Sequence, residues 1–479
     1  MFSARTAIVG SGPRRLTSGV WWLLWPALVG TAVGAAVATN FQIAFLLTVG
    51  VIGCLAIALP ASIWVVAAVV ASLTFKGLVT LGVLPSVATF LDLPLAWGAL
   101  AAALLAARGR PPNSRSAKHL RWLGALSLAV ALAWSFNRSE VVRPVLYLLL
   151  LGEPFAIVAA LWIDPPSVRL RRLLTKTAVV LVAVQVPLML WQAGKYGLGD
   201  GVQGTLYGAA AGAHVISAVA ALSAGWLLAS RRGRHGLSSV AAIIALLVLP
   251  VLADAKQVLF ALPAAAIVGG LRGGRVNLAV QATLVAGALG LLFFTNPLAN
   301  PAVYNLQQAR HGHNGKIETA KLVWHQLETE PASIAFGKGP AETVSRTAFM
   351  TTDLFLHKDS SLRVLHLKPA VIPVEAQLGT VRAGDTGTSF NSGVSSLLGV
   401  FGDLGVFGAL VFTGLVVSLF SSLRRVSSPE SIAATSGWAM YVLLGLVYDW
   451  WEQPPFTVFL AVLTGLAVTS AATSRGERG

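Results

Sequence analysis

Several charged residues lie next to long apolar stretches of the sequence, as they would in a site at a membrane surface. Asp254 and Lys256 occupy a short break inside the apolar stretch 237–271. Almost no loop surrounds Lys256 to solvate its cation, so we expect it at the outer edge of a helix bundle, where an anionic headgroup could pair with it. Such fixed cations suit a diphosphate, because they stabilise the negative charge that develops on the leaving group when a sugar–diphosphate bond breaks.

A long polar stretch, 295–392, supplies further groups for the same chemistry. Arg310 and Arg346 add cations, and five of the eight histidines lie here, at 311, 313, 325, 357 and 366. An attacking sugar hydroxyl needs a general base, and a histidine or a carboxylate serves. We predict no metal site, because His311 and His313 lack a nearby carboxylate pair. The Gly-Lys-Gly at 337–339 lacks the frame of a nucleotide-binding P-loop.

The composition indicates whether water or lipid surrounds the chain that carries these groups. The 479 residues are 55% hydrophobic and 11% charged, whereas soluble domains carry about 25% charged residues. The formal charge of +16 is spread thinly between apolar stretches, unlike the clustered charge of a nucleic-acid binder. The single cysteine, Cys54, excludes an intrachain disulfide and a cysteine-based zinc site. The chain therefore reads as an all-α polytopic membrane protein.

Apolar stretches near the length of a membrane span, about 20 residues, predict about fourteen (12–14) transmembrane helices. We read a tight turn at 254–256, with a single bent span as the competing interpretation. The predicted spans are 19–38, 41–59, 61–81, 93–107, 121–136, 144–163, 177–193, 211–230, 237–253, 257–271, 276–295, 393–420, 433–449 and 455–472.

The basic residues set the expected orientation. They recur in every second loop, at 108–121, 169–176, 231–234, 272–275 and 424–425, and cytoplasmic loops carry such an excess. Both termini are therefore expected in the cytoplasm, with the protein in the cytoplasmic (inner) membrane.

This orientation divides the chain into three parts. They are transmembrane helices over 1–294, a large extracytoplasmic loop over 295–392, and transmembrane helices over 393–479. Within the loop, apolar residues at helical spacing predict an amphipathic helix over 316–329. It would pack on the bundle or lie in the headgroup layer, or else form a lid over a lipid-linked substrate.

Four segments between about 177 and 420 stand, in this order, at outward-facing positions. They are QAGKYGLGDGVQGTLYGAAAGAH (192–214), LPVLADAKQVLFALPAA (249–265), Trp324 with FGKGP (336–340), and LLGVFGDLGVFGALVF (397–412), which holds Asp403, Gly405 and Gly408. Their order and setting resemble the O-antigen ligase and O-antigen polymerase superfamily of membrane glycosyltransferases. That family has a glycine-rich turn, a basic turn, a Trp…Phe-Gly-x-Gly-Pro pattern and an acidic residue-x-Gly-x-x-Gly pattern at these places.

The resemblance implies a metal-independent glycosyltransferase without a cofactor, working at the outer membrane face. Its partners would be a polyprenyl-diphosphate-linked glycan donor, a glycan or lipid-linked acceptor and membrane lipid, with no nucleic acid. Lys256, Arg310 and Arg346 would neutralise the diphosphate, and His311 or His313 would act on the acceptor. The substrate contacts implied are Gln203, His214, Asp254, Trp324, Asn391 and Asp403.

One departure from the family pattern concerns the general base. Ligases of the family carry a His-Asn ahead of the last of these helices, whereas residues 388–392 here read Thr-Ser-Phe-Asn-Ser. This favours a polymerase-type or divergent member and leaves the base open among His311, His313, His357 and Glu375.

Two other classes of protein fit the topology. A transporter or flippase would line a pathway with the same charges, but it would usually show paired, broken repeats, and none is evident in the sequence. A scaffolding partner in an envelope assembly would explain the spans but not the Lys256 turn.

Overall fold

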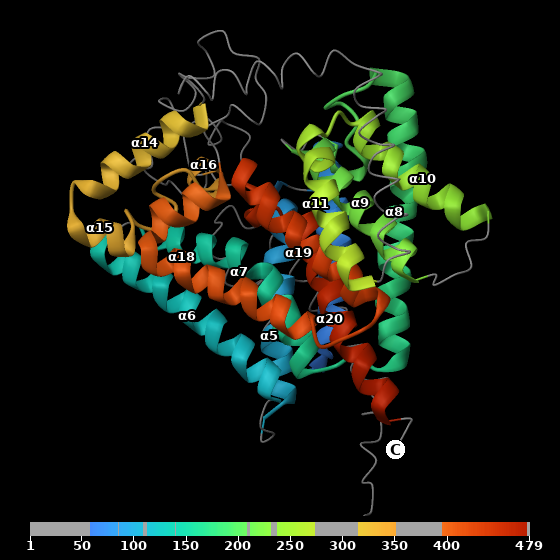
Figure 1. The fold of residues 1–479 in the computed structure, drawn as a ribbon, viewed down its shortest axis with the longest axis horizontal. Coiled ribbons are helices and arrows are strands. Elements are labelled where there is room, and N and C mark those ends of the chain that lie inside the picture. Colours follow the sequence, from blue (N-terminus) through green and yellow to red (C-terminus); the bar gives the residue numbers. More distant parts are fainter. Residues whose placement is uncertain are drawn as a thin grey trace, which may run out of the picture. The chain divides into compact units, whose positions relative to one another are not determined.

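The computed structural model describes residues 58–84, 86–108, 113–138, 140–207, 211–230, 237–273, 315–350 and 395–476. The chain divides into two units, Met1–Ala58 and Leu59–Gly479, and every helix given below lies in the second. Throughout the described ranges, all regular elements are helices and none is a strand (Figure 1).

The elements, in chain order, include short π and 3₁₀ segments beside the α-helices. They are α3 (Ala61–Val70), the π-helix η1 (Ala71–Phe75), α4 (Lys76–Thr80), the 3₁₀ turn η2 (Ser86–Phe90), α5 (Asp92–Ala106), α6 (Ser114–Asn137), α7 (Val142–Ile163), α8 (Val168–Tyr196), the 3₁₀ turn η3 (Gly204–Leu206), α9 (Gly212–Ser230), α10 (Leu237–Leu252), α11 (Lys256–Gly273), α14 (Gly315–Glu328), α15 (Pro331–Phe336), α16 (Arg346–Met350), α18 (Ser396–Leu423), α19 (Pro429–Val447), the 3₁₀ turn η5 (Trp450–Glu452) and α20 (Pro454–Gly476).

Each predicted span that falls within the described residues is helical. By length and apolar composition, eight of these helical segments could cross a membrane, and 237–252, 256–271 and 454–468 are shorter apolar helices. The predicted spans 19–38 and 276–295, and all but the last two residues of 41–59, lie outside the described residues. The fold is that of a multi-pass α-helical membrane protein.

Two helices begin several residues before their predicted apolar spans, because side-chain caps start them earlier. The carboxamide oxygen of Asn113 accepts hydrogen bonds from the N–H groups of Arg115 and Ser116, at 3.1 and 2.9 Å. The Ser167 hydroxyl accepts from Leu170 N–H at 3.4 Å. Such caps satisfy the first amides of a helix, so the basic residues that follow them belong to the first turns of α6 and α8.

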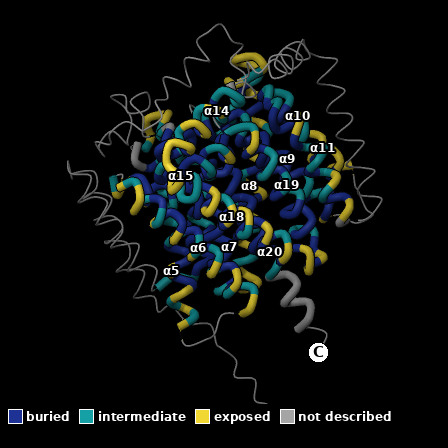
Figure 2. Tube along the Cα trace, turned by 60° about the vertical axis from the view of Figure 1, so that its left-hand side comes forward, coloured by how far each residue is buried: buried dark blue, intermediate teal, exposed yellow. Residues whose placement is uncertain are grey.

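The helices differ in how far they are buried, as expected for a bundle in lipid. In α7, 78% of the most apolar 18-residue window is buried, against 28% in α8. α7 packs on α5, α6 and α20, and α19 packs on α9, α11, α18 and α20. Buried residues accordingly concentrate in the interior of the bundle (Figure 2). Val180, Val184 and Trp191 of α8 are exposed, which in water would form an unfavourable apolar patch but suits contact with lipid.

Contacts between loops define the two ends of the bundle. At one end, Arg171 pairs with Glu430 at 3.6 Å, and Ala61 N–H donates to Asp164 at 3.2 Å. At the other end, α14, α15 and α16 lie against the bundle (Figure 1). The described part of the long polar stretch, 315–350, therefore lies at the end of the bundle away from Arg171 and Asp164.

α18 is broken inside its span. Gly405 has φ 67° and ψ −167°, which is not helical. The break leaves the carbonyls of Gly402 and Asp403 without helical partners, and they accept hydrogen bonds from Lys338 N–H (2.8 Å) and Gly339 N–H (3.2 Å). We call residues 335–347 the strap. A Cβ on Gly405 would lie 2.5 Å from Ala335 C and Gly337 N, so glycine is required where the strap crosses the break.

The predicted amphipathic helix is present as α14, and it packs on the bundle. Val323 and Leu327 are buried together with Val344 of the strap, and Leu398 and Phe401 of α18 pack against this cluster. The apolar face of α14 is therefore covered by protein rather than by the headgroup layer, and it supports the strap from one side.

The break at 254–256 is a true helix end. Asp254 N–H donates to the Val251 carbonyl and Ala255 N–H to the Pro250 carbonyl, at 3.2 and 2.9 Å. These bonds, with Asp254 at φ 48°, form a Schellman motif, a common way to terminate a helix. The prediction of a tight turn is confirmed, and α11 begins immediately afterwards at Lys256.

We predict that Gly405→Ala destabilises the protein by about 2 kcal/mol or more, because the new Cβ meets strap backbone and the residue keeps a positive φ. The measurement is the thermal unfolding of the purified protein in detergent, followed by tryptophan fluorescence. Gly124→Ala on α6 is the matched control, since a Cβ there meets nothing within 4 Å. Equal unfolding temperatures for the two variants would contradict the packing described.

Candidate functional site

Asp403 holds the strap through its backbone amides. The side chain is fully buried, and its carboxylate accepts hydrogen bonds from the N–H groups of Ala341 (3.0 Å), Glu342 (3.2 Å) and Thr343 (2.8 Å) and from the Thr343 hydroxyl (2.6 Å). Because these bonds occupy both oxygens and no part of the side chain is exposed, the geometry gives Asp403 a positioning role rather than direct contact with a substrate.

Arg143 at the start of α7 fixes the other side of the same turn. Its Nη1 pairs with Glu342 at 2.8 Å and donates to the Ala341 carbonyl at 3.3 Å. Both charged side chains are buried, with 1% and 8% exposed. Ala341 has φ 62°, an unfavourable backbone conformation for alanine, and the bonds from Asp403 and Arg143 on either side hold it there.

The C-terminal part of the strap docks on the turn between α19 and α20. Glu452 accepts from Arg346 N–H (3.2 Å), Thr347 N–H (2.8 Å) and the Thr347 hydroxyl (2.5 Å). Arg346 Nη1 donates to Asp449 at 3.0 Å. Burial raises the pKa of Glu452 to about 7, although the bonds from Thr347 oppose the shift. We call Arg143, Glu342, Arg346, Asp449 and Glu452 the strap group.

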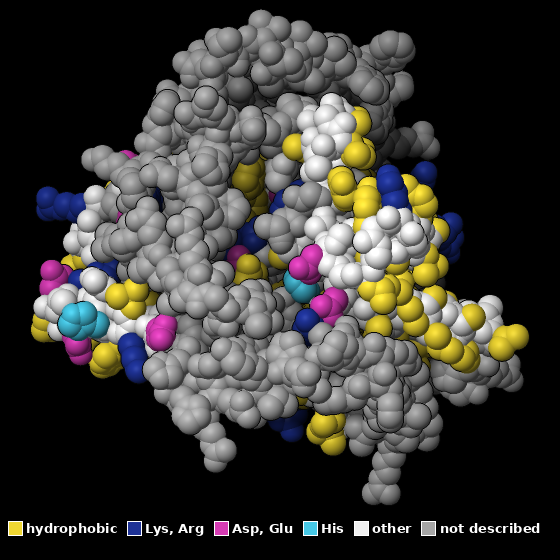
Figure 3. Space-filling model, turned by 90° about the horizontal axis from the view of Figure 1, so that it is seen from above, with side chains coloured by type: hydrophobic (Ala, Val, Ile, Leu, Met, Phe, Trp, Pro, Cys, Tyr) yellow, Lys and Arg dark blue, Asp and Glu magenta, His cyan; other side chains and the backbone are white. Residues whose placement is uncertain are grey.

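A second set of charges, the turn group, comprises Asp200, His214, Asp254 and Lys256. Lys256 pairs with Asp254 at 2.9 Å, and His214 Nε2 lies 3.4 Å from the Asp200 carboxylate. Acidic, histidine and basic side chains lie beside one another on this face of the molecule (Figure 3). Lys256 therefore already has an anionic partner within the chain.

A buried hydrogen bond joins the two groups. The indole N–H of Trp450, which follows Asp449, donates to the side-chain oxygen of Gln257, which follows Lys256, at 2.7 Å. The strap group and the turn group are thus neighbouring parts of one polar surface at the end of the bundle that carries the strap.

Two glutamines of α8 shape the glycine-rich turn that contains Gln203. Gln192 accepts from the N–H groups of Gln203 (2.9 Å) and Gly204 (2.7 Å) and donates to the Gly204 carbonyl (3.0 Å). Gln185 accepts from Thr205 N–H at 2.9 Å and donates to the Thr205 hydroxyl at 2.8 Å. The two glutamines are seven residues apart and share one face of the helix. The turn is therefore folded back onto the bundle.

The remaining residues predicted from sequence have different positions. Trp324 is half exposed and stacks on Phe401, with 6.4 Å between ring centroids. It is therefore attached to α18. Arg310, His311, His313 and Asn391, together with the alternative bases His357 and Glu375, lie outside the described residues.

Sequence reasoning missed several buried polar residues that the structure brings toward this surface. Glu342 was not singled out within the strap, and Asp92 stands just before the predicted span 93–107. Lys76 was absorbed into the predicted span 61–81, because one charge barely changes a hydropathy window. Charged residues inside spans usually have a functional reason, and that rule would have found Lys76, Asp92 and the buried Glu153 of α7.

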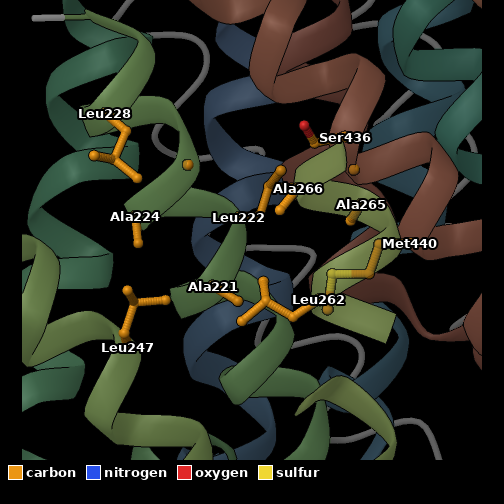
Figure 4. Close-up of a pocket in the computed structure, with 12 residues that line it drawn as sticks. Ala221, Leu222, Ala224, Leu228, Leu247, Leu262, Ala265, Ala266, Ser436 and Met440 are labelled. Carbon is orange, nitrogen blue, oxygen red and sulfur yellow. The ribbon is translucent and has the colours of Figure 1, made fainter. Parts of the chain in front are cut away.

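An apolar cavity of about 50 Å³ lies deeper in the bundle, between α9, α10, α11 and α19 (Figure 4). Leu222, Leu247, Leu262 and Met440 are among its lining residues, and Ser436 is its one hydroxyl. No charged side chain lines it. Its lining therefore offers no cation that would bind a diphosphate.

Within the ranges that the structure describes, no three His, Cys, Asp or Glu side chains group so as to hold a metal ion. No protein-family model matches the chain, and no curated protein matches it.

We predict that Asp403→Asn releases the strap, because the amide nitrogen of asparagine cannot accept the N–H bonds that a carboxylate oxygen accepts. An unsatisfied buried donor costs about 1–3 kcal/mol. Hydrogen exchange of the amides at 341–343 should accelerate relative to the unmodified protein. Asp254→Asn is the control, since that carboxylate is partly exposed and faces Lys256. Unchanged protection in Asp403→Asn would contradict the positioning role.

We predict a pH-dependent stability that arises from Glu452. Its folded pKa of about 7 lies above the unfolded value of about 4.3, so the folded state binds the proton more tightly. The resulting stabilisation is fully present below about pH 4.3 and is lost as the pH rises through about 7. The difference in unfolding temperature between the unmodified protein and Glu452→Gln should therefore fall from pH 5 to pH 8. A constant or rising difference would overturn this assignment.

Proposed function

We propose that this protein is a glycosyltransferase of the cytoplasmic membrane that transfers a glycan from a polyprenyl-diphosphate donor to a sugar acceptor at the outer face. The proposal includes fourteen membrane spans, both termini in the cytoplasm, and a polymerase-like or ligase-like role in assembling surface polysaccharide. It requires a polar surface at the outer end of the bundle, formed by the spans together with the long external stretch.

The observation that carries the proposal is the joining of two sequence patterns that are about 60 residues apart. The segment Phe-Gly-Lys-Gly-Pro at 336–340 lies directly on the break at Asp403 and Gly405 of α18, through the bonds of Lys338 and Gly339 N–H. These are two of the four patterns through which the sequence resembles the glycosyltransferase superfamily. Their contact supports the view that they form one functional unit.

The proposed reaction assigns roles to this surface. The acceptor hydroxyl oxygen attacks the anomeric carbon of the donor sugar, the bond from that carbon to the phosphate oxygen breaks, and polyprenyl diphosphate leaves with the electron pair. The hydroxyl proton goes to a general base, for which His311, His313, His357 and Glu375 stay candidates. Arg346 would stabilise the leaving group, and Lys256 would do so by exchanging Asp254 for a phosphate.

A flippase is the alternative class, and the break in α18 is the feature that could favour it, since transporters use broken helices to line their sites. Here the carbonyls of Gly402 and Asp403 at the break bind strap amides. They are therefore occupied by the protein's own backbone, which favours the transferase.

We predict that the purified protein, reconstituted in vesicles with a lipid-linked glycan repeat, forms longer glycan and releases polyprenyl diphosphate. Arg346→Ala and Lys256→Ala should abolish both products without lowering the protein level. Lys195→Ala is the control and should leave both products unchanged. Lys195 also stands at this end of the bundle, but its ammonium lies over the ring of Trp191, 5.0 Å from the ring centroid, and belongs to neither the strap group nor the turn group.

Three results would contradict the proposal. One is transbilayer movement of the lipid-linked repeat that depends on the protein and occurs without glycan growth, which would indicate a flippase. Another is full product formation by both Arg346→Ala and Lys256→Ala. The third is the absence of any product from the unmodified protein.

A further inference from the structure

We propose that Glu153 binds a proton near the middle of the membrane and exchanges it through Asp92 with water at the strap-bearing end of the bundle. The two acids thus form a proton relay that runs inward between α5 and α7. The relay goes beyond the proposed glycosyltransferase, whose acceptor proton passes to a base at the polar surface and needs no group within the spans.

Glu153 lies halfway along α7. It is the twelfth of the 22 residues of this helix. At 1.5 Å per residue it stands about 17 Å from the first of them, near the centre of a hydrocarbon core about 30 Å thick. The side chain is fully buried. Ionisable residues at this depth are costly and mark functional sites.

The carboxyl group of Glu153 has no hydrogen-bond partner among the described residues. The two arginines near the start of α7 are bound to other carboxylates, Arg143 to Glu342 at 2.8 Å and Arg346 to Asp449 at 3.0 Å. An ionised carboxylate buried without a partner is far more costly than the neutral acid, so such a group takes up a proton. Glu153 is therefore a proton-binding group.

The backbone beside Glu153 offers an acceptor for that proton. Pro154 has no N–H, so it cannot make the helical hydrogen bond to the Leu150 carbonyl, one turn before it. A carbonyl freed by a proline in a span must be satisfied by a neighbouring group. The neutral acid carries the O–H that a carboxylate lacks. The proline therefore favours the protonated form of Glu153.

The side of α7 that carries Glu153 faces α5. Leu146, Leu150 and Glu153 are four and three residues apart, so they share one stripe of the helix. The two leucines form a buried cluster with Leu93 of α5. One turn after Leu93, the indole N–H of Trp97 donates to a backbone carbonyl of α7 at 3.1 Å. Glu153 therefore lies on the stripe of α7 that packs against α5.

Asp92 stands at the strap-bearing end of the same interface. It is the first residue of α5, directly before Leu93, and only 4% of it is exposed. Met350 of α16 packs against the leucine cluster, which places this end of α5 beside the strap. Side chains in a helix lean toward its N-terminus, and α7 begins at this end. The side chain of Glu153 accordingly leans in the direction of Asp92.

The other titratable groups around α7 leave Asp92 as the partner. α3 and residues 454–468 of α20 contain none. His119 of α6 approaches from the opposite end of α7, with Nε2 3.0 Å from the Phe155 carbonyl. The remaining ones on α7 and the helical elements around it are Arg143, Tyr147, Arg346, Asp403, Tyr441 and Glu452. The two arginines and the two acids of this set are engaged by the strap contacts described above.

Infrared spectroscopy of the full-length purified protein in detergent tests whether Glu153 holds a proton. A neutral carboxylic acid has a higher carbonyl stretching frequency than a carboxylate. At pH 8, above the pKa of about 7 of Glu452, the unmodified protein should show an acid band that Glu153→Gln lacks. Glu328→Gln should keep the band, because Glu328 is exposed on α14.

Transfer of the same samples into D2O tests the relay. Deuteration shifts the acid band, so the rate of the shift measures proton exchange with solvent. Asp92→Asn should slow this exchange by about a hundredfold, an effect typical of losing a positioned proton-transfer group. Asparagine keeps the shape of the side chain and can still accept the Leu93 N–H. Asp92→Glu, which retains a carboxyl group, should exchange as fast as the unmodified protein, and the amide band of each sample shows whether its helices are intact.

Three results would overturn the relay. The first is an acid band of equal strength in Glu153→Gln and the unmodified protein, which would show that Glu153 carries no proton. The second is exchange in Asp92→Asn that is as fast as in the unmodified protein. The third is loss of the acid band when sodium chloride replaces choline chloride, which would identify a site for a metal cation in place of the proton.

Discussion

The docking of the strap on the break in α18 is the constraint on which the rest of this end of the molecule depends. A helix interrupted within a membrane leaves backbone carbonyls without partners, and such groups must be satisfied by protein. Lys338 and Gly339 N–H satisfy two of these carbonyls, while the Asp403 carboxylate satisfies three amides of the strap in return. The break and the strap therefore stabilise each other, since either one alone would leave backbone groups without hydrogen-bond partners.

The charged groups gain their positions from this docking. Once Asp403 sets the turn at 341–343, Glu342 meets Arg143 and residues 346 and 347 meet Glu452. Buried ions are tolerated when they are paired or hydrogen-bonded. Glu342 pairs with Arg143, Asp449 pairs with Arg346, and Glu452 accepts three hydrogen bonds from residues 346 and 347.

The described spans and the amphipathic helix α14 could be predicted from sequence, because apolar length and helical spacing are local signals. The turn at 254–256 was predicted for the same reason. The ion pair within this turn could not be predicted from sequence. It depends on the αL conformation of Asp254, which turns that carboxylate toward Lys256, and a pattern of charges does not show a backbone angle. The contacts of Asp403 with 341–343 and of Arg143 with Glu342 join residues about 60 and 200 positions apart. Composition and periodicity carry no information about such pairings, although the glycines at 337 and 405 mark both sides of the contact.

The most direct test of the proposed function is the pattern of lipid-linked glycans in cells that lack the protein. The transferase account predicts an accumulation on polyprenyl diphosphate at the outer membrane face. Single repeat units would identify a polymerase, and long polymer on the same carrier would identify a ligase. Lipid-linked glycans that are unchanged in length, amount and membrane side after loss of the protein would contradict the account.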